Sequence, residues 1–470
     1  MSALTLTAAG IAQASGGQVV QGDPETRIES VSIDSRSVQP GQFFVAIRGD
    51  RFDGHDFVQA ALTAGAIGAL IEAERGARIG EQGGQPGVLV RVADTTRALQ
   101  SIARDVRRRS GTKVVAITGS AGKTTTKEIT AEFLSARYRV FRNKGNLNNH
   151  IGLPLSLLEL RSQPEIAVVE LGMNHPGEIR TLIGIAEPEV RVWTNVGDAH
   201  MGFFESPDAI ADAKAEVLEQ AGPADVLVAN ADDPRITARA SRFPGRVLTF
   251  GVDNAADVRA TEVRMQGLDG TVANVITPAG NVQLQTPLLG RGNLANVLAA
   301  TATAIHFGVP LDAIRERAAR LTAASHRGEL LRLPGGITII DDSYNSSPSA
   351  LMRALELVAA AEGCARKIAV LGEMLELGAH AGRLHRECGA AAAQSGLSIV
   401  IAVGGEPARS LADAAIAGGM PVECVHHVPA KQDAAKLALQ FVRPGDLVLV
   451  KGSRGIGTDY VVEQLRREFA

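Results

Sequence analysis

Short apolar runs alternate with helical stretches in residues 113–233. Four of these runs contain four to six apolar residues and are stopped by glycine, asparagine, aspartate or glutamate: KVVAITGS, EIAVVELG, VRVWTNVG and DVLVANADD. Runs without polar alternation are typical of strands buried on both faces, as in a parallel sheet that helices cover. The pattern therefore predicts a doubly wound, mostly parallel α/β sheet.

The pattern changes on either side of this region. Residues 250–290 include alternating pieces such as NVQLQTPLL, which favour an antiparallel edge. From about residue 325, GITIIDDSYN, RKIAVLGEM, LSIVIAVGG and DLVLVKGSRG again alternate with helices, which predicts a second, Rossmann-like sheet. The first 110 residues carry shorter strand-like pieces and an Ala-rich helix. We predict three α/β domains, namely a smaller N-terminal domain of residues 1–110, a central domain of 111–324 and a C-terminal domain of 325–470.

Composition narrows the class of protein. A chain of 470 residues with 45% hydrophobic and 21% charged residues is typical of a soluble protein of several domains. The net charge of −3, without a basic stripe, argues against a nucleic-acid partner. No apolar run approaches the roughly 18 residues of a membrane span, and three scattered cysteines indicate reduced thiols. We expect a cytoplasmic protein, and a monomer.

A glycine loop follows the first buried run. In TGSAGKTT, Gly119 and Gly122 permit backbone conformations in which amide groups point at phosphate oxygens at a helix N-terminus. Lys123 would neutralise the β and γ phosphates, and the Thr124 hydroxyl would bind Mg²⁺. Residue 117 is isoleucine, so the loop is shorter than the usual G-x-x-x-x-G-K-[ST] pattern. The predicted loop comprises Gly119, Ser120, Ala121, Gly122, Lys123, Thr124 and Thr125.

Three further residues lie where the buried runs end or in the helix after them. Glu170 ends a strand, where its carboxylate could reach Mg²⁺ or face solvent. His200 follows another buried run, where a lone histidine is more often structural than a ligand. Lys214 lies in a helix that Ser206 caps and Pro207 begins, and the helical pattern alone favours a solvated lysine.

These pieces together resemble the Mur ligases, ATP-dependent enzymes that form amide bonds in peptidoglycan synthesis. The resemblance rests on TGSAGKTTTKE, NLNNHIGLPL, VELGMNHPGEI, GDAHMG, AKAE and GNLANVLAA in the central region. The segments DSR and FVAIRGDRFDGHDF near the N-terminus, with DDSYNSSP and LGEMLELG in the third region, extend it over nearly the whole chain. These outer segments are similar to those of the member that uses D-alanyl-D-alanine.

The resemblance implies a reaction in two steps. ATP phosphorylates the terminal carboxylate of a UDP-N-acetylmuramoyl-tripeptide, and the amine of D-alanyl-D-alanine then attacks the acyl phosphate through a tetrahedral intermediate. ADP and phosphate are released. The reacting anions repel each other by about 4 kcal/mol at roughly 4 Å and an effective dielectric constant of about 20. Positioning and charge neutralisation by Mg²⁺ and Lys123 therefore carry most of the catalysis.

The same resemblance assigns roles near the phosphates. Thr124 and Glu170 correspond to ligands of the nucleotide Mg²⁺, and His200 to a ligand of a second metal ion. Lys214 matches a lysine that the family carbamylates with CO₂, which converts an ammonium into an anionic metal ligand. Asn148 and Asn149 correspond to paired asparagines near the phosphates and the end of the tripeptide.

Further implied contacts lie around the nucleotide base and ribose. The family pattern His-Asn-x-x-Asn reads Gly292, Asn293, Leu294, Ala295, Asn296 here, so the two amides remain and the imidazole is absent. Arg327 resembles an arginine that reaches the γ-phosphate, although His326 precedes it where the family usually has glycine. Asp341 resembles an acidic residue that contacts the ribose.

The outer regions are implied to bind the two other substrates. Ser35 and Arg36 resemble part of a uridine-diphosphate site, where arginine offers a planar fork of donors. Tyr344, Asn345 and Lys451 resemble the walls of a D-alanyl-D-alanine pocket. His55 is either a ligand or a turn histidine satisfied within the chain. We expect the third domain to rotate when ligands bind, about a hinge near residues 325–328.

Other functions fit parts of the pattern. A related ligase that adds a single amino acid would differ mainly in the third domain. A P-loop kinase would phosphorylate a hydroxyl group, and a nucleotide-binding regulator would use ATP as a switch. Neither of these two classes accounts for Lys214, His200 and the last domain together. The sequence leaves open whether the acceptor peptide carries diaminopimelate or lysine.

Overall fold

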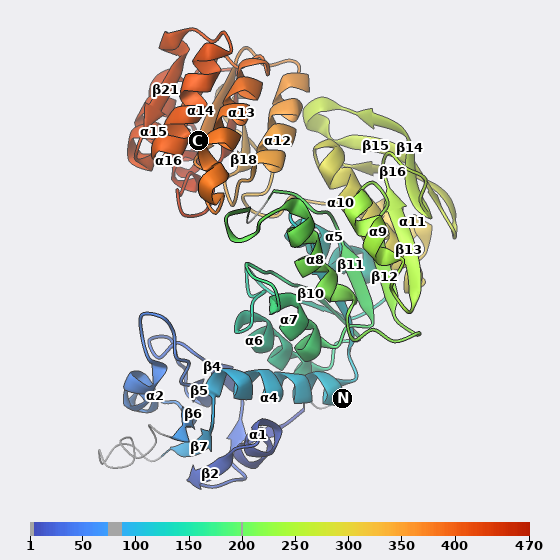
Figure 1. Cartoon of the computed structure of the whole chain (residues 1–470), viewed down its shortest axis with the longest axis vertical. Helices are drawn as coiled ribbons and strands as arrows, with labels where there is room; N and C mark the ends of the chain where they lie inside the picture. Colours follow the sequence, from blue (N-terminus) through green and yellow to red (C-terminus); the bar gives the residue numbers. More distant parts are fainter. Residues whose placement is uncertain (1–3, 74–86, 199–200) are drawn as a thin grey trace. The chain divides into compact units, whose positions relative to one another are not determined.

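The computed structural model describes residues 4–73, 87–198 and 201–470 (Figure 1). The chain divides into two compact units. Unit 1 contains residues 1–116, 138–173 and 177–190, and unit 2 contains residues 117–137, 174–176 and 191–470. The predicted His200 lies outside the described residues. The boundaries of the three predicted domains stay a prediction.

Unit 1 is built on a five-stranded sheet with the order β2-β7-β6-β5-β4, in which only β2 is antiparallel to its neighbour. Helix α4 begins after Asp94, whose side chain accepts from Arg97 N, and ends at Gly111 in the left-handed conformation. The elements of this unit are β1 (Leu6–Thr7), α1 (Ala8–Ser15), β2 (Gln18–Gln21), β3 (Arg27–Ile28), β4 (Ser30–Ser32), β5 (Gln42–Val45), α2 (Val58–Thr63), β6 (Gly68–Glu72), β7 (Val88–Val92), α4 (Thr95–Ser110), β9 (Val140–Arg142), α6 (Gly152–Leu158), β10 (Ile166–Glu170) and α7 (Glu178–Ala186). Strand β8 (Lys113–Thr118) begins in unit 1.

The first half of unit 2 carries the glycine loop. Its strands follow the order β16-β15-β14-β13-β12-β11. Strands β12, β13 and β14 are parallel, whereas β14, β15 and β16 form an antiparallel edge, as the alternating pattern predicts. The elements are α5 (Lys123–Leu134), β11 (Val190–Trp193), α8 (Pro207–Ala215), β12 (Val226–Asn230), α9 (Pro234–Ala240), β13 (Arg246–Gly251), β14 (Val258–Met265), β15 (Thr271–Thr277), β16 (Gly280–Thr286), α10 (Gly290–His306) and α11 (Leu311–Ala318).

The second half of unit 2 is a six-stranded sheet with the order β17-β18-β22-β19-β20-β21. All neighbours are parallel except β17 and β18. The elements are β17 (Glu329–Arg332), β18 (Thr338–Asp342), α12 (Pro348–Ala360), β19 (Lys367–Gly372), α13 (Ala381–Ala393), β20 (Ile399–Val403), α14 (Glu406–Ala417), β21 (Val425–Val428), α15 (Lys431–Phe441), β22 (Leu447–Lys451) and α16 (Asp459–Phe469). The predicted mostly parallel α/β fold is confirmed.

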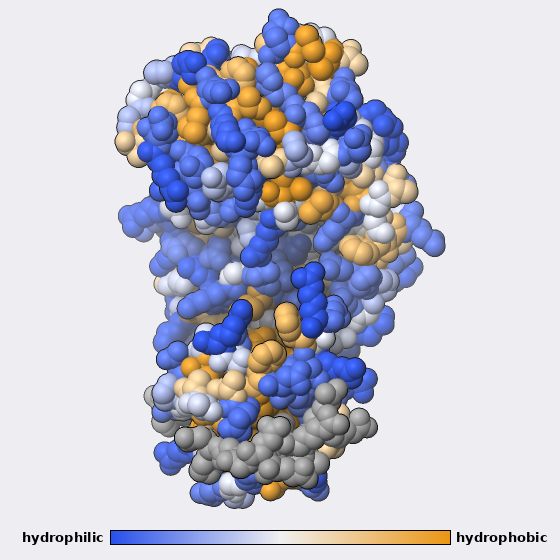
Figure 2. All heavy atoms as spheres, turned by 90° about the vertical axis from the view of Figure 1, so that its left-hand side faces the viewer, coloured by the Kyte–Doolittle hydropathy of each residue, from blue (hydrophilic) through white to orange (hydrophobic). Residues whose placement is uncertain are grey.

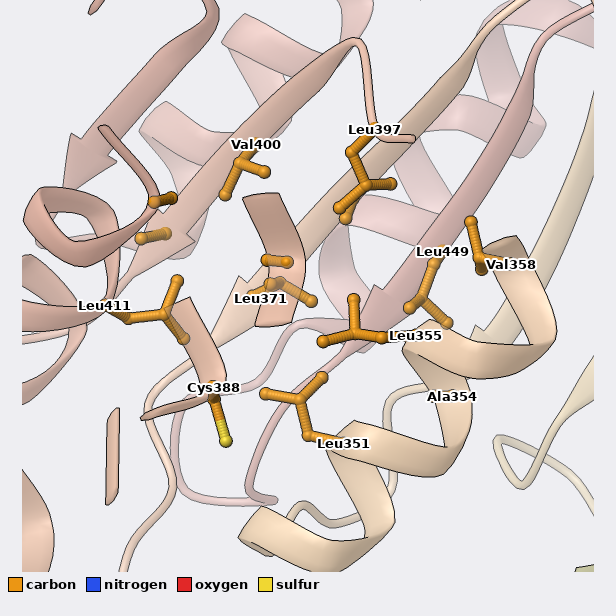
Figure 3. Packing of buried hydrophobic residues seen from close by; sticks show 14 of the residues in the cluster. Leu351, Ala354, Leu355, Val358, Leu371, Cys388, Leu397, Val400, Leu411 and Leu449 are labelled. Atoms are coloured by element: carbon orange, nitrogen blue, oxygen red, sulfur yellow. The ribbon is translucent and has the colours of Figure 1, made fainter. Parts of the chain in front are cut away.

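Helices cover both faces of this six-stranded sheet. Leu371 and Leu449 point to one face, where they pack with residues of α12, α13 and α14 (Figure 3). Val370 and Val448, each the strand neighbour of one of these leucines, point to the other face, where α15 and α16 pack. Successive side chains of a strand point to opposite faces, so a run buried on both sides must be apolar throughout.

The surface is mixed in character. The face in Figure 2 is mainly hydrophilic, with hydrophobic side chains scattered over it. Large exposed hydrophobic side chains include Phe52, Phe203 and Val422. Among the described residues, no helix is both long and apolar enough to cross a membrane. Cys364, Cys388 and Cys424 are free thiols, and burial raises the pKa of Cys388 to about 12.

Candidate functional site

The glycine loop joins β8 to α5 and has no room for side chains at its two glycines. Gly119 has φ of 150° and Gly122 has φ of 78°. A Cβ on Gly119 would lie 2.0 Å from Oγ1 of Thr194, and one on Gly122 would lie 2.4 Å from Oδ1 of Asn296. Both glycines are therefore required by the backbone conformation and by the close approach of neighbouring side chains.

Asn195 holds the loop in place. Its Oδ1 accepts from Ala121 N at 2.8 Å, and its Nδ2 donates to Ala121 O at 2.9 Å. Ser120 N donates to the carbonyl of Asn195 at 3.0 Å. Gly197 N donates to Ser120 Oγ at 2.9 Å. Asn195 was not among the predicted site residues, although it is one of the polar residues that stop a buried run and are expected to face a cleft.

We expect Gly119→Ala to lose nucleotide binding. The added methyl group would overlap Thr194 Oγ1, so the loop must move away from the geometry that Asn195 sets. Affinity for ADP should fall at least tenfold in titration calorimetry, and the melting temperature should fall. Gly222→Ala is the matched control, because a Cβ there meets nothing within 4 Å. Equal ADP affinity in the two variants would contradict this prediction.

Lys123 begins α5 and lies back over the loop. Its Nζ donates to Gly119 O at 2.8 Å. Thr124 follows it in the first turn of α5, whereas Thr125 is buried. The helix N-terminus, the loop amides and a lysine thus come together at one place, as an anion site requires.

Lys214 is buried, with only 1% of its surface exposed. The interpretation as a solvated helical lysine is therefore wrong, although Ser206 caps α8 and Pro207 begins it as predicted. The side chain of Lys214 makes no hydrogen bond or ion pair with any residue that the structure describes. Burial, and then the charge of Lys123, hold the pKa of Lys214 well below its usual value. A buried amine of this kind is a candidate functional group.

Glu170 and the paired asparagines lie in unit 1. Glu170 ends β10, is 3% exposed, and accepts from Asn148 Nδ2 at 2.7 Å. Asn149 Oδ1 accepts from Ile151 N and Gly152 N at the start of α6. The structure thus brings Asn148 to Glu170, while Asn149 holds the following turn.

The two asparagines at the start of α10 form one network with α5. Asn296 Nδ2 donates to Asn293 Oδ1 at 3.2 Å, and Asn296 Oδ1 accepts from Thr126 Oγ1 at 3.1 Å. Asn293 Nδ2 donates to Leu289 O at 2.9 Å. Since Asn296 also lies against Gly122, the first turns of α10 are placed directly beside the glycine loop.

Asp341 fixes the segment before β17. Its Oδ2 lies 2.8 Å from Nδ1 of His326, and its Oδ1 accepts from Ser343 Oγ at 2.5 Å. His326 has φ of 60°, so it adopts the left-handed conformation that a glycine would favour. Arg327 stacks over the ring of Tyr344, with 3.9 Å between its Cζ and the ring centroid. His326 thus adopts the turn conformation that the glycine usual at this position in the family would allow.

The predicted dipeptide residues meet at the ends of β18 and β22. Lys451 Nζ donates to Asp342 Oδ2 at 2.5 Å and to Asn345 O at 3.1 Å. Tyr344 accepts from Arg454 Nη1 at 3.4 Å. Lys451 is 3% exposed. Through these two hydrogen bonds Lys451 holds the DDSYN segment in place.

The predicted diphosphate residues lie in a turn after β4. Arg36 donates to both carboxylate oxygens of Asp34, at 2.8 and 2.7 Å, and holds the pKa of Asp34 at about 2. Ser35 lies beside it in the turn. His55 is buried, with Nδ1 2.6 Å from Asp53 and Nε2 accepting from Glu72 N at 2.9 Å. Both ring nitrogens of His55 thus have partners within the chain, which favours the turn histidine over the ligand.

Comparison with protein families gives three matches along the chain. The model of the Mur ligase middle domain matches residues 117–304, and that of the Mur ligase glutamate ligase domain matches residues 326–454. The model described as Mur ligase family, catalytic domain, matches residues 27–107.

Curated relatives and solved structures are similar over nearly the full length. UDP-N-acetylmuramoyl-tripeptide–D-alanyl-D-alanine ligase of Bacillus subtilis (strain 168) is 34% identical over 94% of this chain and 94% of its own. The enzyme of the same name from Escherichia coli (strain K12) is 34% identical over 93% of this chain and 94% of its own. A crystal structure of MurF from Acinetobacter baumannii has 30% identity and a TM-score of 0.88, covering 99% of this chain and 100% of that chain. MurF from Thermotoga maritima in complex with ADP has 29% identity and a TM-score of 0.81, covering 94% and 97%.

Proposed function

Since this chain belongs to the Mur ligase family, we propose that it joins D-alanyl-D-alanine to a UDP-N-acetylmuramoyl-tripeptide and converts ATP to ADP and phosphate as it does so. One combination of features supports this proposal above the others. The glycine loop that ends at Lys123 has the backbone geometry that a phosphate site needs, and the side chain of Lys214 is buried without a partner among the described residues. A kinase or a nucleotide switch needs the first of these features but has no use for the second.

The proposed chemistry turns a carboxylate into a good acylating group. ATP bound at the loop transfers its γ-phosphoryl group to the tripeptide carboxylate, and ADP leaves. The dipeptide amine attacks the acyl carbon, loses a proton, and phosphate departs from the tetrahedral intermediate. Lys123 and the amides at the start of α5 would stabilise the charge that develops on the transferred phosphoryl group.

We propose Mg²⁺ as the cofactor, because the predicted donors suit it. The Thr124 hydroxyl, the buried Glu170 carboxylate and a carbamate on Lys214 would all supply oxygen ligands, which Mg²⁺ prefers. His200 would complete a second site and lies outside the described residues. When bound, the metal would neutralise phosphate charge. Lys214 suits carbamylation, because its burial favours the neutral amine, the form that reacts with CO₂.

The remaining assignments are also proposals. Ser35 and Arg36 would bind the uridine diphosphate, and Asn148 and Asn149 would contact the phosphates and the end of the tripeptide. Asn293, Asn296, Arg327 and Asp341 would bind the nucleotide, and Tyr344, Asn345 and Lys451 the dipeptide. We further propose a cytoplasmic monomer whose third domain rotates about residues 325–328, where His326 and Gly328 have positive φ.

The proposed function is tested by complete product analysis. The purified chain is incubated with ATP, Mg²⁺, a UDP-N-acetylmuramoyl-tripeptide and D-alanyl-D-alanine, and with each component omitted in turn. ADP, phosphate and the amide product should appear in equal amounts and only in the complete mixture. Acceptor peptides with diaminopimelate and with lysine are compared. Amide formation with a single amino acid instead of the dipeptide would favour the related ligase, and ADP without amide would overturn the proposal.

A further inference from the structure

Helix α12 presents two different faces. Leu351, Leu355 and Val358, spaced four and three residues apart, are buried and point into the core of the six-stranded sheet (Figure 3). Ser349 and Arg353 are four residues apart and therefore share one face of the helix, which lies away from these leucines. The packing of α12 on its own sheet thus determines the direction in which Arg353 leaves the helix.

This second face of α12 lies along the elements of the nucleotide site. A Cβ on Gly197 would lie 3.2 Å from Ser349 Oγ and 3.7 Å from Cβ of Ser120 in the glycine loop. A Cβ on Gly292 would lie 3.7 Å from both Cδ and Nε of Arg353. The arginine side chain therefore lies beside Gly292, in space that a larger residue at 292 would use.

The position of Gly292 indicates which part of the nucleotide is near. Asn296 lies against Gly122 of the glycine loop, and Gly292 precedes it by four residues, about one helical turn. A nucleotide whose phosphates bind at the glycine loop would reach Gly292 with its base if it extends along α10 in this direction. Gly292 is also the position at which the family pattern has a histidine.

Arg353 is a cation without a partner among the described residues. Its guanidinium makes no hydrogen bond and no ion pair with any of them. Arg353 is an exposed residue, yet the groups packed around its guanidinium lower its pKa by desolvation, against the opposing effect of Glu356, Asp342 and Asp198. A guanidinium stays charged at all accessible pH values, so this group gains from a ligand that offers a π face or an acceptor.

We propose that Arg353 stacks on the adenine ring of the bound nucleotide, and that Gly292 provides the space for it. Arginine is thereby a base-recognition residue supplied by the third domain, in place of the missing imidazole. This inference rests on the proposed function, since it takes the glycine loop to bind ATP. A planar guanidinium over an aromatic ring is attracted by the ring quadrupole, and a partly desolvated contact of this kind changes affinity about tenfold.

The first test compares two probes that share phosphates and differ in the base. Titration calorimetry of the full chain with ADP should show about tenfold weaker binding for Arg353→Ala and an intermediate loss for Arg353→Lys. Pyrophosphate should bind wild type and both variants equally, because it has no base. Arg409→Ala, an exposed arginine on α14, is the control and should bind ADP as wild type does. An equal loss for ADP and pyrophosphate, or no loss for ADP, would overturn the proposal.

The second test uses competition for the same space. Gly292→His alone should weaken ADP binding, because the imidazole and Arg353 overlap, and Gly292→His with Arg353→Ala should restore it. If Gly292→His binds ADP like wild type, or the double variant is weaker than either single variant, Arg353 is not the base contact. Neither titration requires tripeptide or dipeptide, so both can be interpreted even if the ligation assay shows no amide product.

Discussion

Replacing Lys123 with alanine is expected to abolish amide formation, with a loss of at least a thousandfold in kcat/KM, or about 4 kcal/mol of transition-state stabilisation. Lys123 lies over the glycine loop with its Nζ 2.8 Å from Gly119 O, where it can move to the phosphates of a bound nucleotide. Without it, the transferred phosphoryl group loses the cation that the glycine loop supplies. ADP release, measured in the complete reaction mixture, should fall together with amide product.

The controls for this variant separate charge from folding. Lys436→Ala removes an exposed lysine of α15, 73% exposed, and should leave turnover unchanged. Lys123→Arg retains the charge but not the compact ammonium, so it should recover only a small part of the rate. Circular dichroism and melting curves should match wild type within the error of the measurement. Wild-type turnover in Lys123→Ala would contradict the phosphate role of the loop.

Replacing Lys214 is expected to give the second large loss. Lys214→Ala should lower the rate of ligation at least a hundredfold, because the proposed anionic carbamate can no longer form. An excess of a short carboxylate such as acetate should restore part of the activity, since it can occupy the space of the missing carbamate. Lys214→Met fills that space and should not be restored. Wild-type activity in Lys214→Ala would refute the carbamate.

Stability should move in the opposite direction from activity at this position. The folded protein buries Lys214 and lowers its pKa, so between the folded value and the unfolded value of about 10.4 the unfolded chain binds more protons. The free energy of unfolding of the wild type therefore increases as pH rises through this window. Lys214→Met lacks this penalty, and its melting temperature at neutral pH, in CO₂-free buffer, should exceed that of wild type by about 2 °C or more. A lower melting temperature would contradict this account.

Local patterns predicted the elements near the site well. The run KVVAITGS became β8 and the loop after it, and the alternating NVQLQTPLL became the antiparallel strand β16. Ser206 and Pro207 began α8 as expected. These features depend on the periodicity of apolar side chains and on the conformations that individual residues allow, and both are properties of neighbouring residues in the sequence.

The sequence by itself determined the α/β class, the buried runs, the glycine loop and the helix that carries Lys214. Only the tertiary structure decided that Lys214 is buried, that Asn195 holds the loop, and that Arg353 lies beside Gly292. Asn195 is distant in the chain from the loop that it holds, and Arg353 is distant from Gly292. The burial of a side chain and the filling of space by a distant residue depend on which elements pack together, and no local pattern encodes that choice.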